Sequence, residues 1–104
     1  MINRFIITAV AINNYYIKKT SKNLEYIEFN AQTNNANQDK LFTFTFIAFG
    51  NTSKYIQAHF KDLKENFAIY QGSLLPNKKD TNSVIIQVKD VELIGSIGKE
   101  TESI

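Results

Sequence analysis

The stretch LFTFTFIAFG, residues 41–50, decides the fold. Phenylalanine alternates with threonine along most of it, and a glycine ends it. Successive side chains of a β-strand point to opposite faces, so this alternation divides the stretch into two faces. One face carries Phe42, Phe44, Phe46 and Ala48, and the other carries Thr43, Thr45, Ile47 and Phe49. The stretch therefore predicts the central strand of a small antiparallel sheet, with one face in a core and the other half-solvated.

Two strands are expected before this central one. Residues 2–12 are mostly β-branched and apolar, and residues 24–33 alternate apolar with polar side chains. The aromatic and basic run 15–19 lies between two turn-rich segments, so we expect it in the first loop. Residues 34–40 are polar except for Ala36 and rich in turn-forming residues, so they predict a hairpin loop.

A helix is expected directly after the central strand. Residues 51–53 (Asn-Thr-Ser) offer side chains that can cap a helix. Apolar side chains then recur at spacings of three and four from Tyr55 to Leu63, which is typical of one amphipathic helix of about three turns. We expect it to end within residues 61–66, with lysines on its outer face.

Two further strands complete the chain. Residues 67–75 and 83–94 predict strands, and residues 76–82 predict a hairpin tip between them. Gly72, inside the first of these strands, predicts a bulge or a barrel corner. Residues 95–104 are expected to be a frayed tail.

The expected order is β-β-β-α-β-β. Five strands with a helix between the third and fourth is the layout of the oligonucleotide-binding (OB) fold, an all-β barrel. The chain has 104 residues, which suits one domain. We therefore expect an OB-fold domain over residues 1–95 and a short flexible tail over residues 96–104.

Composition argues against several classes of function. The chain has no cysteine and one histidine, His59, so thiol chemistry is absent and a histidine-based zinc site is not expected. No apolar run approaches membrane-spanning length, and no nucleophile–base pair, carboxylate dyad or phosphate loop is visible. We expect a cytoplasmic protein that is not an enzyme and has no cofactor. The net charge of +2 permits an anionic partner without requiring one.

Five segments in order resemble the bacterial single-stranded DNA-binding protein family. Residues 3–7 (Asn-Arg-Phe-Ile-Ile) match the opening of that family, and residues 27–31 match its second strand. Residues 44–50 match its third strand, which ends in an apolar residue, phenylalanine and glycine. Residues 69–72 and 89–94 match the fourth and closing strands. The resemblance covers about residues 1–95 and implies an OB fold that binds single-stranded DNA.

The sequence also departs from that family. It carries neither a long linker nor an acidic tip that ends in Pro-Phe, and Thr43 stands where the family often has an aromatic residue. The primosomal replication protein N family is similarly short, opens Met-x-Asn-Arg, and closes on a strand like residues 92–94 (Glu-Leu-Ile). The Ala-Phe-Gly ending of residues 48–50 favours the first family, and the length favours the second. A truncated chain, or a phage or mobile-element version of the first family, also fits the length.

Binding of a single strand requires cations that contact phosphates and flat side chains that stack on bases. The resemblance implies that Phe49 stacks and that Arg4 is the basic residue of the first strand. At the hairpin tip Lys79 stands where the family has an aromatic residue, so that contact is expected to be electrostatic. The full set of candidate DNA-binding residues is Arg4, Tyr15, Tyr16, Lys18, Lys19, Thr43, Thr45, Phe49, Tyr70, Lys78 and Lys79.

Each candidate also has a structural interpretation. Phe49 can plug the barrel, Tyr15 and Tyr16 can cover its mouth or an oligomer contact, and residues 78–79 can form a solvated turn. The expected partners are single-stranded DNA, a second copy of the chain and replication or restart proteins, without a membrane. In a homodimer or homotetramer, residues 3–10 would pair across a two-fold axis. Three hypotheses remain open: a DNA binder, a restart adaptor, and an oligomer subunit with a wholly buried barrel surface.

Overall fold

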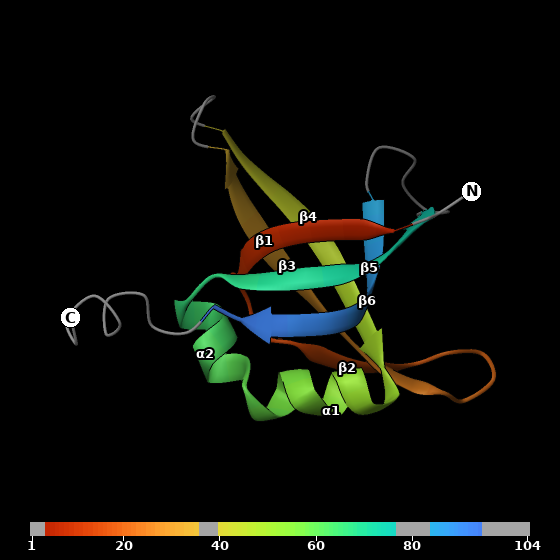
Figure 1. Cartoon of the computed structure of the whole chain (residues 1–104). Coiled ribbons are helices and arrows are strands. Elements are labelled where there is room, and N and C mark those ends of the chain that lie inside the picture. Colours follow the sequence, from red (N-terminus) through yellow and green to blue (C-terminus); the bar gives the residue numbers. More distant parts are fainter. Residues whose placement is uncertain (1–3, 36–39, 77–83, 95–104) are drawn as a thin grey trace.

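The computed structural model describes residues 4–35, 40–76 and 84–94. Within these residues the chain forms six strands and two helices, with the helices together at one end of the strands (Figure 1). In chain order they are β1 (Phe5–Ala11), β2 (Tyr16–Lys19), β3 (Glu25–Asn35), β4 (Lys40–Phe49), α1 (Gly50–Ala58), α2 (Phe60–Glu65), β5 (Ala68–Pro76) and β6 (Val84–Leu93).

Five of the strands close into a barrel in the order β1-β5-β6-β4-β3. The ring closes because β3 also pairs with β1, at Val10↔Gln32 and Ala11↔Ala31. Every pairing in the ring is antiparallel except that of β4 with β6, which is parallel around Phe46↔Ile86. The predicted OB-fold barrel, with its helical segment between the third and fourth barrel strands, is confirmed.

Aromatic rings fill the barrel. Phe29, Phe46 and Tyr70 are at most 1% exposed, and the rings of Phe46 and Tyr70 lie 4.6 Å apart. Phe29 packs edge-on against Phe46 at 5.5 Å and against Phe60 of α2 at 5.3 Å, so α2 covers the core. Burial of a side chain of this size contributes about 1.5–3 kcal/mol.

The two faces of the central strand are largely as predicted. Phe46 and Ala48 are fully buried and Phe44 packs against the core, while Thr43 is exposed. Phe42 is 43% exposed, so its predicted place in the core is wrong. Among the described residues, β6 pairs with β4 from Thr45 to Ile47, and the first residues of β4 pair with β3 alone.

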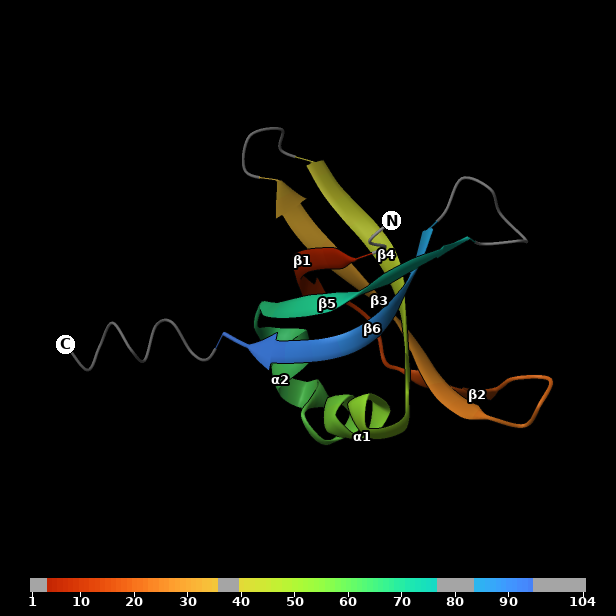
Figure 2. The same ribbon diagram turned by 45° about the vertical axis from the view of Figure 1, so that its right-hand side comes forward.

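The run at residues 15–19, which was expected in a loop, contains strand β2. It pairs with β3 from Tyr16↔Glu28 to Lys19↔Glu25, outside the closed ring. The turn is fixed because the Thr20 hydroxyl accepts hydrogen bonds from the backbone N–H groups of residues 22 and 24. Figure 2 shows the β2–β3 hairpin projecting away from the barrel.

The single predicted helix is two short helices. The backbone leaves the helical conformation at His59, with φ −113° and ψ 17°, and α2 starts at the next residue. The predicted side-chain cap is also absent from α1, which follows Phe49 without one. Thr52 instead donates from Oγ1 to the carbonyl of Lys89 over 3.1 Å, which holds α1 against β6.

The predicted bulge at Gly72 is confirmed. Gln71 pairs with Asp90, but Gly72 pairs with Val88, so Lys89 has no opposite residue on β5. A Cβ atom at Gly72 would overlap the backbone carbonyl of Gln87. Glycine is required here because β5 and β6 approach too closely for any side chain.

Candidate nucleic-acid interface

Two aromatic rings pack against each other on the outer face of the sheet, near the start of β3 and at the end of β4. Phe49 lies directly opposite Tyr26, and their ring centroids are 5.2 Å apart at an interplanar angle of 34°. Both side chains are half-buried and neither belongs to the core. Phe49 therefore does not plug the barrel, and its ring borders solvent beside a second ring.

Strand β2 extends this face. Directly paired residues of adjacent strands point to the same side of a sheet, so Tyr16 lies beside Glu28, and Lys18 beside Tyr26. Tyr16 is 59% exposed. We call the set of Tyr16, Lys18, Tyr26, Glu28 and Phe49 the ring face, after its aromatic rings.

A charge pair crosses the ring face. Lys18 Nζ lies 3.0 Å from Glu28 Oε2, with 47% and 29% of the two side chains exposed. The hydrogen bond to Glu28 is the main cause of a raised pKa for Lys18, so the ammonium stays charged across the physiological range. Glu28 offsets much of the positive charge that Lys18 brings to the face.

Thr43 and Thr45 continue the outer face along β4 and are tied to β3. Gln32 donates from Nε2 to Thr43 Oγ1 over 3.3 Å, and Asn30 donates from Nδ2 to Thr45 Oγ1 over 3.2 Å. Asn13 donates from Nδ2 to Asn30 Oδ1 and accepts at Oδ1 from the backbone N–H of Asn30, both over 2.8 Å. Each threonine oxygen accepts within the sheet, and neither hydroxyl donates to another described residue, so its hydrogen can reach a ligand.

Arg4 lies on a different part of the barrel. It stands at the start of β1 and donates from Nη2 to Gln71 Oε1 of β5 over 2.7 Å. Strands β5 and β6 lie between β1 and β4 on that side of the ring. The structure therefore does not bring Arg4 together with Phe49.

Two of the predicted tyrosines belong to the protein interior. Tyr70 is fully buried between Phe29 and Phe46, so its predicted contact with DNA is wrong. Among the described residues its hydroxyl has no hydrogen-bond partner, and burial raises its pKa. Tyr15 packs edge-on against Phe60 at 5.0 Å and helps to cover the core, as its structural interpretation proposed.

The remaining candidates are basic. Lys19 is exposed and pairs with Glu25, on the opposite side of the hairpin from Lys18. Lys78 and Lys79 lie outside the described residues. Lys22 is exposed in the turn of the β2–β3 hairpin, and we did not predict it as a candidate.

Tyr26 was not among the predicted candidates. The alternation of residues 24–33 does predict that it lies on the solvated face of its strand. Its position opposite Phe49 follows only from the register between β3 and β4.

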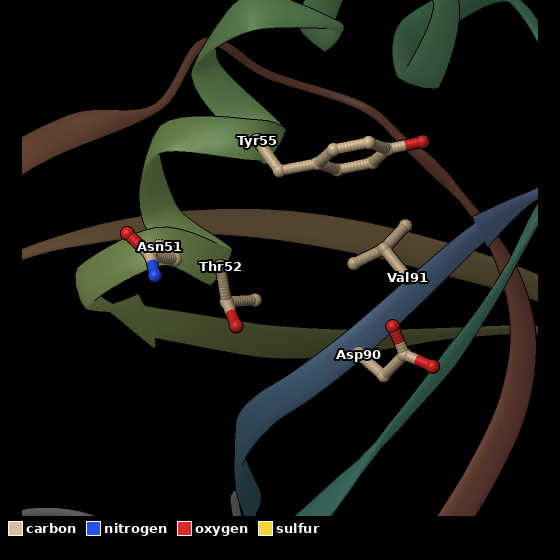
Figure 3. Close-up of a pocket in the computed structure, with 5 residues that line it drawn as sticks. All are labelled: Asn51, Thr52, Tyr55, Asp90 and Val91. Carbon is tan, nitrogen blue, oxygen red and sulfur yellow. The ribbon is translucent and has the colours of Figure 1, made fainter.

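A cavity of about 340 Å³ lies between α1 and β6. Figure 3 shows Tyr55 extending from α1 over Val91 of β6, with Asp90 beside it. The other lining residues are Asn51 and Thr52. None of the ring-face side chains lines this cavity.

The described part of the chain carries neither a cluster of metal-binding side chains nor a membrane-spanning helix. No group of three or more histidine, cysteine, aspartate or glutamate side chains could hold a metal ion there. Neither helix in those ranges is long and apolar enough to cross a membrane.

Solved structures with a similar fold include single-stranded DNA-binding domains and PriB proteins. The SSB domain of a Synechococcus protein superposes with a TM-score of 0.66 at 13% identity, over 88% of this chain and 96% of that one. PriB from Ralstonia solanacearum gives 0.66 at 12% identity, over 90% and 99%. A small single-stranded DNA-binding protein from Mycoplasma pneumoniae gives 0.58 at 14% identity, over 92% and 91%.

Sequence comparison adds nothing to these structural matches, since no family model and no curated protein matches the chain. The solved structures belong to the two groups that the sequence resembles, the single-stranded DNA-binding domains and the primosomal PriB proteins. That resemblance is therefore confirmed as a likeness of fold.

Proposed function

We propose that this protein binds single-stranded DNA without catalysis and largely without regard to sequence. The observation that carries the proposal is the pair of neighbouring aromatic rings, Tyr26 and Phe49, on an outer sheet face. Base–aromatic stacking contributes about 1–3 kcal/mol per base and tolerates any sequence, because every base has a π-face. Tyr16, exposed on the adjacent strand, offers a further ring.

The β2–β3 hairpin supports the electrostatic part of the proposal. It carries Lys18 beside the aromatic pair, Lys22 in its turn and Lys19 on its opposite side, all exposed. Because β2 is the edge strand of the sheet, phosphates of a DNA strand that leaves the aromatic rings around this edge can reach all three ammonium groups. Three such contacts predict a slope of about −2 for the logarithm of affinity against the logarithm of salt concentration.

This activity suits protection of exposed strands in DNA replication, recombination or repair. We place the protein in the cytoplasm, near the nucleoid, and assign it no cofactor and no reaction. A homodimer or homotetramer would align several ring faces along one strand. The tip residues Lys78 and Lys79 stay in the proposal as electrostatic contacts.

A second candidate function is that of a primosomal restart adaptor, which would act mainly through protein partners. Two observations favour it. Lys18 is paired with Glu28, which weakens the attraction of the ring face for phosphate. The fold is also as similar to PriB as to the SSB domain. This candidate predicts weak DNA binding and recovery of a helicase or a resident single-strand binder in a pull-down.

Titration of a labelled oligothymidine of roughly 16 nucleotides, the upper end of the OB-fold site sizes, tests the proposal. Fluorescence anisotropy should show saturable binding that weakens roughly twentyfold between about 50 and 200 mM salt. Absence of saturable binding at the lower salt concentration would contradict the proposal and favour the restart-adaptor function.

A further inference from the structure

Glu28 places a carboxylate on the very face that we propose for a polyanion. It pairs with Tyr16 on one side and Ile47 on the other, and Tyr26 lies two residues before it on the same face. Its side chain is 29% exposed, so it is accessible without being free in solvent. A surface that only attracted phosphate would gain nothing from a carboxylate in this position.

One oxygen of this carboxylate is engaged and the other is not. Lys18 donates from Nζ to Oε2 over 3.0 Å, which orients the group. Within the described ranges Oε1 has no hydrogen-bond partner. An ionised carboxylate only accepts hydrogen bonds. A ligand atom that meets Oε1 must therefore be a donor.

A base stacked on Phe49 brings such a donor within reach. Phe49 lies opposite Tyr26, so Glu28 is its diagonal neighbour across the strands, and side chains at that roughly 7–8 Å separation still interact. We infer that Glu28 recognises the exocyclic amino group of a base stacked on Phe49, so that the site prefers cytosine to thymine. This inference rests on the proposed function.

Cytosine and thymine differ at the exocyclic atom that would meet Glu28 Oε1. Cytosine presents its N4 amino group as a donor, for which glutamate and aspartate are the matching acceptors. Thymine presents the O4 carbonyl at the same place, so two acceptors face each other without a hydrogen between them. The two bases are of similar size and present the same kind of face to the rings. The preference therefore adds to stacking that tolerates every base.

The experiment compares labelled oligodeoxycytidine and oligodeoxythymidine of about 12 nucleotides, a length within the site sizes of OB folds. Wild type is measured beside Glu28→Gln, which removes the charge and carries both a donor and an acceptor. The matched control is Glu25→Gln, which removes the same charge from the same strand. Glu25 pairs with Lys19 and lies on the opposite side of the hairpin.

Wild type should bind the cytidine strand at least about fivefold more tightly, as expected for one hydrogen bond to a charged group on a partly exposed face. Glu28→Gln should bring the ratio of the two affinities close to one, mainly by raising the affinity for the thymidine strand, because the amide can donate to O4 where the carboxylate cannot. Glu25→Gln should leave the ratio unchanged. Circular dichroism of each variant confirms that the fold is retained.

Several outcomes would overturn the inference while leaving the proposed function intact. These are equal affinities in wild type, a ratio that Glu28→Gln does not change, and a ratio that Glu25→Gln abolishes equally. A preference for thymidine would assign recognition to the Lys18 ammonium, which donates to O4, and would equally contradict a role for Glu28. Failure to bind either strand would instead overturn the proposed function.

Discussion

Substitution of Phe49 or Tyr26 should weaken DNA binding by the stacking energy of one aromatic ring. Replacing Phe49 with alanine removes one stacking surface, which contributes about 1–3 kcal/mol per base, or roughly 5- to 150-fold in affinity. Tyr26→Ala should cost a similar factor. Because the two ring centroids are 5.2 Å apart, the rings support the same base or neighbouring bases. The double variant should therefore lose less than the sum of the two single losses.

Anisotropy titrations of wild type, the two single variants and the double variant give the coupling energy between the two rings directly. The matched control is Phe42→Ala, which removes the same ring from the same strand, where Phe42 is 43% exposed and lies on the opposite face from Phe49. It should change affinity less than twofold. Urea denaturation checks that the variants remain folded. The stacking assignment fails if Phe49→Ala binds within twofold of wild type, or if Phe42→Ala loses as much.

Three further predictions test the fold and the limits of the site. Gly72→Ala should destabilise the protein by about 1–3 kcal/mol or more in urea denaturation, because the added Cβ overlaps the backbone carbonyl of Gln87, which cannot rotate away; wild-type stability would contradict the described bulge. Tyr70→Phe should keep or increase stability at pH 7, because it removes a buried hydroxyl without a partner among the described residues. Burial raises the pKa of Tyr70, so this tyrosine ionises near pH 10 in the unfolded chain and only at higher pH in the folded protein. The free energy of unfolding therefore falls as pH rises above about 10. Between pH 7 and pH 11, urea denaturation should show a smaller loss of stability in the phenylalanine variant than in wild type. Arg4→Ala should change DNA affinity less than threefold, because Arg4 bonds Gln71 away from the ring face, and a tenfold loss would extend the site to β1.

Alternation of side chains was enough to predict the barrel strands. The central strand, its buried face from Phe44 to Ala48 and the bulge at Gly72 all follow from local pattern and from the special geometry of glycine. The break at His59 could not be predicted, because the apolar spacing continues across this residue although its backbone leaves the helical conformation. Strand β2 was missed because its four residues show no alternation and become a strand only by pairing with β3.

The candidate site was predicted less completely than the fold. Phe49, Thr43 and Thr45 lie on the outer face as expected, because period two assigns them to it. Tyr70 shares the inner face of β5 with Ala68, and the resemblance alone does not reveal that burial. The places of Tyr26 and Glu28 depend on strand register, which a single sequence does not specify.

The most direct test of the central claim is to map where a single strand lies on the protein. An oligonucleotide that carries 5-iodouracil at each position in turn can be photocrosslinked to nearby aromatic residues, and the attached peptides identified by mass spectrometry. We predict crosslinks at Phe49, Tyr26 and Tyr16, with none at the exposed Tyr55 beside the α1–β6 cavity. Crosslinks confined to Tyr55 or to the β1–β5 side of the barrel would contradict a binding site on the ring face.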